Sequence, residues 1–155
     1  MKKVMFISST GGHLDELMQL KPIFKNYDYS IVTEKTKSNI NLKNKFPKVS
    51  FLVFGTKDHL FSYIFKFIYN CFKSIFLFIK YRPNIIVTTG THTAVPMCYI
   101  GKLFRRKIIF IETFANRNTK TLAGKLVYPI ADKFIVQWES MLKLYPKAEL
   151  WGWIY

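Results

Sequence analysis

Three side chains able to exchange protons or accept hydrogen bonds follow three separate apolar runs of the sequence. His13 comes after the first run, His92 after the run NIIVTT, and Glu112 ends the run KIIFIE. If these runs are parallel strands, the three side chains meet at one sheet edge, because open α/β sheets bind ligands beyond the carboxyl ends of their strands. Their spacing matches no standard set of metal ligands, and the chain has no GxSxG turn of a serine hydrolase. We therefore expect neither a metal site nor a serine hydrolase.

A pair of glycines precedes the first histidine in Ser9–His13, which joins the first expected strand to a helix. Glycine permits positive φ and close approach of the backbone to a ligand, and a helix N-terminus offers free N–H groups to an anion. The segment is not GxGxxG and lacks the Lys-Ser/Thr of a P-loop, so it does not predict a dinucleotide or ATP site. A tight turn without a ligand is one interpretation. The histidine favours a binding site, because imidazole can take a proton from a substrate hydroxyl near neutral pH.

Short β-branched runs alternate with longer segments at helical spacing. Such runs are typical of strands covered on both faces, and strands that alternate with helices form parallel sheets. The predicted strands are Val4–Ser8, Tyr29–Glu34, Val49–Phe54, Asn84–Thr89, Lys107–Glu112 and Lys133–Trp138. The predicted helices are about Leu14–Lys25, Leu60–Tyr81, Ala94–Phe104 and Thr119–Ile130, and Glu139–Tyr155 has room for a helical turn or two and one more strand. The pattern predicts a single open, doubly wound α/β domain over residues 1–155.

The composition is that of one basic, packed domain. Its 155 residues carry 24 Lys and Arg against 9 Asp and Glu, a net charge of +15, and half of them are hydrophobic. This excludes disordered and disulfide-rich chains, and we expect Cys71 and Cys98 to be reduced thiols of the core. The excess positive charge is spread along the chain and attracts a phosphate-bearing partner. Nucleic acid is disfavoured, because no recognition motif is present and the aromatic residues cluster in a helix.

The segment His59–Tyr81 carries nine Phe or Tyr residues and predicts a helix of about 23 residues, roughly 34 Å long. One narrow polar stripe runs along it, and its three lysines argue against a membrane span. The stripe consists of Ser62, Lys66, Asn70, Lys73 and Lys80. Two interpretations remain: a crossover helix with part of its apolar face on the sheet, or a helix whose outer flank lies in the interface of an anionic membrane. The side chains expected at the membrane are Phe61, Phe65, Lys66, Phe72, Lys73, Phe76 and Lys80.

These motifs together resemble a glycosyltransferase family. Three stretches carry the resemblance: SSTGGHLDEL, RPNIIVTTGTHTAVP and IIFIETFANRNTKTLAGKLVYPIADKFIVQWESMLKLYPKA. They are similar to the bacterial capsule and exopolysaccharide relatives of the membrane-bound subunit of the two-part UDP-GlcNAc transferase of dolichol-linked oligosaccharide synthesis. The resemblance covers essentially the whole chain. More distantly, the chain looks like the N-terminal half of the lipid II-forming GlcNAc transferase, whose GGxGGH loop and HEQN segment correspond to Thr10–His13 and Ile111–Asn116.

The resemblance implies a GT-B glycosyltransferase divided between two chains. This chain would be the acceptor-side, Rossmann-like half, which binds a polyprenyl-diphosphate-linked sugar at the cytoplasmic face of the bacterial membrane, and a second chain would bind the UDP-sugar. The length agrees, because a GT-B enzyme needs two domains and 155 residues hold one. The implied reaction is an inverting sugar transfer in capsular or extracellular polysaccharide synthesis that uses no metal or other cofactor. The alternative is a non-catalytic scaffold that recruits and activates a partner glycosyltransferase.

The correspondence also implies roles for individual residues. His13 is implied as the general base or as the group that orients the acceptor, and Glu112 as a hydrogen-bond partner of the acceptor or a support for His13. Ser9 and Thr10 stand where the related loop has a further glycine, which is a departure from that pattern. The residues implied in substrate binding are Thr10, Gly11, Gly12, Gly90, His92, Asn116 and Arg117.

Several of these residues also have a structural interpretation. Glu112 and His92 could cap the helices that follow them, and Arg117 could be a solvated surface charge. The tryptophans near the C-terminus either complete the core or anchor the partner chain. We expect Trp151 and Trp153 at the partner interface, because tryptophan is enriched at binding hot spots.

Overall fold

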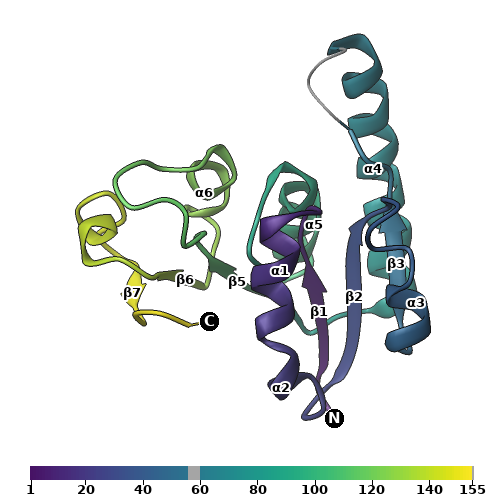
Figure 1. Cartoon of the computed structure of the whole chain (residues 1–155), viewed down its shortest axis with the longest axis horizontal. Helices are drawn as coiled ribbons and strands as arrows, with labels where there is room; N and C mark the ends of the chain where they lie inside the picture. The colour runs from purple at the N-terminus through teal and green to yellow at the C-terminus, as the bar shows by residue number, and fades with distance from the viewer. Residues whose placement is uncertain (56–59, 155) are drawn as a thin grey trace.

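One parallel sheet organises the chain. The computed structural model describes residues 1–55 and 60–154, and within them seven parallel strands lie in the order β3-β2-β1-β4-β5-β6-β7 (Figure 1). The strands are β1 (Lys3–Ile7), β2 (Asp28–Glu34), β3 (Val49–Leu52), β4 (Ile85–Thr88), β5 (Lys107–Ile111), β6 (Lys133–Val136) and β7 (Glu149–Leu150). From β1 the chain adds β2 and β3 on one side, then crosses to add β4 on the other. The carboxyl ends of β1 and β4 are therefore the switch point at which open α/β sheets bind ligands.

Helices cover both faces of this sheet. They are α1 (Gly12–Gln19), α2 (Lys21–Phe24), α3 (Leu42–Lys45), α4 (Leu60–Tyr81), α5 (Val95–Leu103) and α6 (Leu122–Val127), with 3₁₀ turns η1 (His92–Ala94) and η2 (Glu139–Lys143). Val4 and Phe6 of β1 pack in one core cluster with Leu17 of α1, whereas Met5 and Ile7 belong to the core under α4, α5 and α6. Because successive side chains of β1 are buried on opposite faces, the strand needs a continuous apolar run. The predicted doubly wound α/β fold is confirmed.

Two predicted helices are shorter than their sequence pattern indicates. The segment Leu14–Lys25 divides into α1 and α2, because Pro22 has no N–H to donate and cannot extend the hydrogen bonding of α1. The segment Thr119–Ile130 contains only α6, whose start is set by the Thr121 hydroxyl accepting the Gly124 N–H at 2.9 Å. The single turn of α3 is not predicted by the sequence pattern. The last stretch of chain holds one 3₁₀ turn, η2, and one short strand, β7, as predicted.

One face of α4 packs on the sheet. Asn70 is only 6% exposed; its Nδ2 donates to the Val53 carbonyl and its Oδ1 accepts the Val53 N–H, both at 2.8 Å. Asn70 therefore faces the backbone after β3, and the predicted polar stripe of α4 is buried at this position. The predicted helix start at His59 and the side chain of Ser62 lie outside the described residues.

The opposite face of α4 is exposed and aromatic. The exposed fractions are 83% for Phe61, 72% for Phe65, 69% for Phe72 and 63% for Phe76. Lysines at seven-residue intervals fall along one line beside this face, because seven residues make nearly two helical turns. α4 is thus a crossover helix between β3 and β4 whose outer aromatic face does not contact the sheet. None of the helices in the described ranges combines the length and apolarity needed to cross a bilayer.

Replacing Asn70 with Ala removes both hydrogen bonds to Val53 and leaves that backbone N–H and carbonyl without their partner beneath α4. We expect the free energy of unfolding, measured by urea denaturation, to fall by about 1–3 kcal/mol. The matched control is Asn44→Ala in α3, an exposed asparagine whose side chain makes no hydrogen bond in the described ranges. It should change stability by less than about 0.5 kcal/mol. Equal stability of Asn70→Ala and wild type would contradict this contact.

Candidate functional site

The glycine loop leaves open space at the start of α1. Gly11 has φ of +76° and its carbonyl accepts the N–H groups of Leu14 and Asp15, so it turns the chain from β1 into the helix. A Cβ placed on Gly11 or on Gly12 would meet nothing within 4 Å. The loop therefore places exposed backbone at the N-terminus of α1 with open space beside it.

His13 is held against the loop that follows β4. Its Nδ1 lies 2.8 Å from the Thr89 carbonyl, and the Thr89 hydroxyl donates to the His13 carbonyl at 2.6 Å. A carbonyl oxygen only accepts hydrogen bonds, so Nδ1 carries the hydrogen and Nε2 of the neutral ring is the acceptor. Gly90 follows Thr89 with a φ of +97°, a backbone conformation that favours glycine, and a Cβ there would be in ordinary van der Waals contact with the His13 ring. The geometry gives His13 one nitrogen able to take a proton.

Glu34, at the end of β2, joins the glycine loop to the His92 turn. It is 2% exposed; its Oε1 accepts the Thr93 hydroxyl at 2.5 Å and lies 3.6 Å from His92 Nε2. Its Oε2 accepts the Thr10 N–H at 3.3 Å. Glu34 is not among the predicted site residues, although it ends a β-branched run, SIVTE, in the same way as Glu112 ends KIIFIE. Thr10, His92 and the glycine loop are thereby brought together at the switch point.

A mainly apolar pocket of about 350 Å³ opens beside His92. Tyr63 and Phe67 of α4 form one wall, and Leu122 and Leu126 of α6 lie among its other lining residues. The rings of Tyr63 and His92 are 5.5 Å apart. Burial, and next the charge of Glu34, raise the pKa of the Tyr63 hydroxyl. This end of the switch point can receive apolar groups.

Glu112 is directed toward α6 and η2. Its carboxylate accepts hydrogen bonds from the Thr121 hydroxyl and the Tyr145 hydroxyl, each at 2.9 Å, and from the Thr113 N–H at 3.2 Å. Within the described ranges it has no contact with His13, and Thr121 rather than Glu112 caps α6 directly. Glu112 is 2% exposed, and burial raises its pKa even though the hydrogen bonds from Tyr145 and Thr121 favour its charged form. The structure therefore brings His13 and His92 to the switch point, whereas the direct hydrogen bonds of the Glu112 carboxylate go to Thr113, Thr121 and Tyr145.

Asn116 and Arg117 contact other parts of their own region. Asn116 Nδ2 donates to the Thr119 carbonyl at 3.1 Å, within the loop before α6. The Arg117 guanidinium stacks 4.1 Å from the centre of the Trp138 ring. Neither side chain has a recorded contact with His13 in the described ranges.

Exposed tryptophans gather near the end of the described chain. Trp153 stacks on Phe114 with ring centres 5.4 Å apart, and Phe114 packs on Trp138 at 4.6 Å. Trp151 lies beside β7, where its Nε1 donates to Glu149 at 2.9 Å. Trp151 and Trp153 are both exposed, so neither is a core residue.

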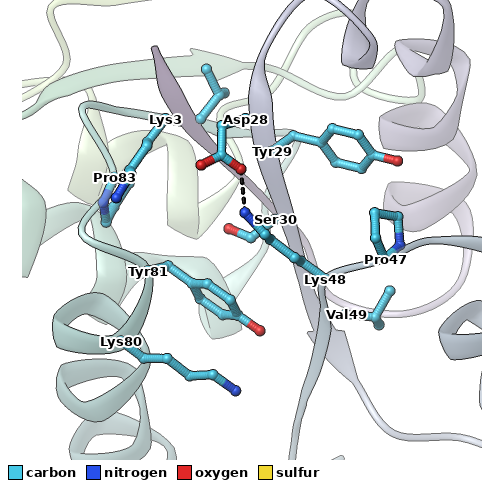
Figure 2. A pocket seen from close by; sticks show the side chains of 11 residues that line it. Lys3, Asp28, Tyr29, Ser30, Pro47, Lys48, Val49, Lys80, Tyr81 and Pro83 are labelled. Atoms are coloured by element: carbon cyan, nitrogen blue, oxygen red, sulfur yellow. Dashed lines mark hydrogen bonds and ion pairs between the residues drawn. The ribbon is translucent and has the colours of Figure 1, made fainter. Parts of the chain in front are cut away.

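A second cavity lies at the opposite edge of the sheet, near the amino ends of β1 and β2. It has a volume of about 440 Å³, and Lys48 pairs with Asp28 across it (Figure 2). The hydrogen bond from Lys48 holds the pKa of Asp28 below its usual value. This cavity contains none of the predicted catalytic or substrate-binding residues, so the chemistry we consider belongs to the carboxyl edge.

The family assignment follows from the sequence profile described as "Oligosaccharide biosynthesis protein Alg14 like", which matches residues 4–154. The chain belongs to the Alg14-like family. The matched range includes the glycine loop, the His92 turn and the segment after β5. The predicted family resemblance is confirmed at this level for the Alg14-like chain.

Curated proteins named "UDP-N-acetylglucosamine transferase subunit ALG14" are similar to this Alg14-like chain. The Candida albicans protein is 41% identical over 91 residues, which cover 55% of this chain and 42% of that protein. The Yarrowia lipolytica protein is 26% identical and the match covers 97% of this chain and 80% of that protein. Both organisms are eukaryotes, so these relatives do not bear on the bacterial capsule setting.

Solved structures show the same fold in larger proteins. MurG of Acinetobacter baumannii matches with a TM-score of 0.72 and 15% identity over 90% of this chain and 43% of that chain. UDP-N-acetylglucosamine 2-epimerase of Rickettsia bellii matches with a TM-score of 0.72 and 17% identity over 94% of this chain and 41% of that chain. The Alg14-like chain spans less than half of each. It has the Rossmann-like fold of the N-terminal half of GT-B glycosyltransferases.

The raised pKa of Glu112 predicts a pH dependence of stability. A carboxyl group whose folded pKa lies above its ordinary value of 4.5 binds a proton more readily in the folded state. Wild type should therefore lose stability relative to Glu112→Gln as the pH rises from about 4.5 through the folded pKa, and the difference should level off above it. Urea denaturation at a series of pH values measures the difference.

The matched control is Glu139→Gln, which removes an exposed carboxylate of η2. Its unfolding free energy should run parallel to that of wild type over the same range. If the unfolding free energy of Glu112→Gln also ran parallel to that of wild type, burial would not raise the pKa of the Glu112 carboxyl.

Proposed function

We propose that this chain is the acceptor-side subunit of a membrane-associated glycosyltransferase. It pairs with a separate chain that binds a UDP-sugar, and the sugar is transferred to a polyprenyl-diphosphate-linked acceptor. The observation that carries the proposal is His13: its Nδ1 is fixed by Thr89 and its Nε2 is left as the acceptor, beside the open glycine loop. Family membership and the names of the curated relatives support a subunit of a UDP-sugar transferase.

The proposed reaction needs one base. His13 Nε2 takes the proton of the acceptor hydroxyl as its oxygen attacks the anomeric carbon of the donor sugar. The new carbon–oxygen bond forms as the bond from that carbon to the UDP oxygen breaks, and the bonding electrons leave with UDP. Attack from the side opposite the leaving group inverts the anomeric configuration. The partner chain, and positive groups facing it, stabilise the departing diphosphate.

The remaining switch-point residues position the acceptor in this proposal. Gly11 and Gly12 leave space for its diphosphate beside the N-terminus of α1, and Thr10, Gly90 and His92 line the same edge. The mainly apolar pocket beside His92 can receive apolar parts of the acceptor.

The segment after β5 forms the next part of the proposed acceptor site. Glu112 holds this segment through its bonds to Thr121 and Tyr145. We propose that Asn116 and Arg117, which lie in this segment, contact the acceptor.

The outer face of α4 supports the proposed attachment to the cytoplasmic face of the membrane. Its exposed phenylalanines form an apolar surface, and lysines of α4 stand beside it. Lys73 and Lys80 also line a groove of about 540 Å³ together with Lys35 and Lys43, and none of its lining residues in the described part of the chain is a carboxylate. Lys73 and Lys80 have no ion pair in the described ranges, and each lies over a tyrosine ring of α4. Apolar side chains beside such lysines are the pattern of a helix that lies in an anionic membrane interface. The membrane contacts we propose are Phe61, Phe65, Lys66, Phe72, Lys73, Phe76 and Lys80.

Trp151 and Trp153 support a partner interface. Both are exposed, and Trp153 extends the ring stack formed by Phe114 and Trp138. We propose that the donor-binding subunit covers them to form a heterodimer. The further proposal that the product is a bacterial capsular or extracellular polysaccharide rests on the resemblance of the sequence motifs.

The proposal predicts that transfer requires two chains and His13. Labelled sugar from UDP-GlcNAc, UDP-Gal or UDP-Glc should pass to membrane lipid when this chain and its donor-binding partner are combined, and much less with either alone. His13→Ala in the reconstituted pair should lower kcat about 10²–10⁴-fold, because the acceptor hydroxyl loses its base.

Size-exclusion chromatography of the pair provides the control, since His13→Ala must still form the complex. An unchanged kcat would remove His13 from the chemistry. Full transfer by the partner alone would instead assign this chain the role of a non-catalytic scaffold.

The membrane proposal predicts that vesicle binding depends on the outer face of α4. Phe72→Ser with Phe76→Ser should lower binding to phosphatidylglycerol vesicles at least about tenfold, because each change removes an apolar ring from the interface. Lys73→Gln with Lys80→Gln should lower binding to these vesicles and leave the weaker binding to phosphatidylcholine nearly unchanged. Vesicle sedimentation measures both.

Matched controls lie on α2, which packs on the opposite face of the sheet. Ile23→Ser removes an exposed apolar side chain there, and Lys25→Gln removes an exposed charge at its end. Neither should alter vesicle binding. Equal losses from the α2 and α4 variants would refute a specific membrane face.

A further inference from the structure

Glu16 lies one helical turn after His13 and connects it to the segment after β5. Its Oε1 accepts the Thr113 hydroxyl at 2.7 Å and the Phe114 N–H at 3.1 Å. Its Oε2 lies 3.9 Å from His13 Nδ1. That second oxygen is buried and has no hydrogen-bond donor among the described residues. A buried carboxylate oxygen without a donor is costly, so its position beside the imidazole needs an explanation.

The groups around His13 Nδ1 explain why this carboxylate oxygen lies there. The Thr89 carbonyl accepts from Nδ1, and the carboxylate of Glu16 faces the same nitrogen. Both groups are acceptors, so both favour the hydrogen on Nδ1 and leave Nε2 with its lone pair. Once Nε2 has taken a proton, the ring is a cation and the nearby carboxylate attracts it.

We propose that Glu16 is a positioning residue for His13. It keeps the imidazole in the form with hydrogen on Nδ1 and fixes the distance between the ring and the segment that starts at Thr113. The catalytic meaning of this inference rests on the proposed function, in which His13 is the base, whereas the contact between Glu16 and His13 can be tested without any activity.

Glu16→Gln separates this role from simple packing. Glutamine has the same shape and can keep an acceptor oxygen for Thr113 and Phe114, but it presents an NH₂ donor where the second carboxylate oxygen faced Nδ1. The matched control is Asp15→Asn, which removes one negative charge from the neighbouring residue of α1. Asp15 is exposed and has no ion pair in the described ranges.

The first measurement is the ¹⁵N spectrum of the His13 ring in the full chain, above the pH at which the ring is protonated. Wild type and Asp15→Asn should show hydrogen on Nδ1, and Glu16→Gln should show a mixture shifted toward hydrogen on Nε2. Hydrogen on Nε2 in wild type would overturn the proposal whatever the variants do. An unchanged ring spectrum in a folded Glu16→Gln would overturn it as well.

The second measurement is turnover by the reconstituted pair. Glu16→Gln should lower kcat about tenfold or more while the KM for the UDP-sugar stays within about twofold, and Asp15→Asn should match wild type. Wild-type kcat in Glu16→Gln, with His13→Ala inactive, would overturn the role of Glu16 and leave the proposed function standing. Full activity in His13→Ala would overturn the proposed function, and the ring spectrum would still test the contact between Glu16 and His13.

Discussion

Two hydrogen bonds between His13 and Thr89 hold the switch point together. They join loops that are 76 residues apart in the chain, and the Ser9 N–H adds a third bond to the Gly90 carbonyl at 3.0 Å. These contacts form because β1 and β4 are neighbours in the sheet and end at the same level, where Ile7 pairs with Thr88. Without that pairing the histidine would be one more solvent-exposed side chain at the start of a helix. The orientation of its ring, and with it every role discussed for the glycine loop, depends on the adjacency of the two strands.

The carboxyl edge also shows how similar sequence signals lead to different surroundings. Glu34 and Glu112 each end a β-branched run, and each is buried and bonded by a threonine hydroxyl. Glu34 lies at the end of β2, next to β1, and therefore reaches the glycine loop. Glu112 follows β5, and its carboxylate is enclosed by α6 and by Tyr145, which follows η2. The difference comes from strand order, which no single strand sequence encodes.

The sequence was sufficient to predict most of the fold and part of the site. Continuous apolar runs identified the strands because burial on both faces imposes that composition, and the glycine loop with its histidine followed from position after the first strand. The division of the first helix at Pro22 depends on a missing backbone donor, and the burial of Asn70 depends on hydrogen bonds to Val53, 17 residues away. A hydrophobic pattern records neither. Glu34 and Glu16 could not be predicted as site residues, because the contacts that matter are with residues distant in sequence. Glu34 contacts Thr93 and His92, and Glu16 contacts Thr113.

The backbone conformation of Gly90 restricts how this fold can evolve. Its positive φ excludes most other residues, and a side chain there would lie against the His13 ring. A Cβ at this position would make only ordinary van der Waals contact with that ring, so the need for glycine comes from the backbone conformation and not from the histidine. A lineage that loses the histidine therefore gains no freedom to replace the glycine. Relatives that keep the scaffold without the histidine should still have glycine after β4.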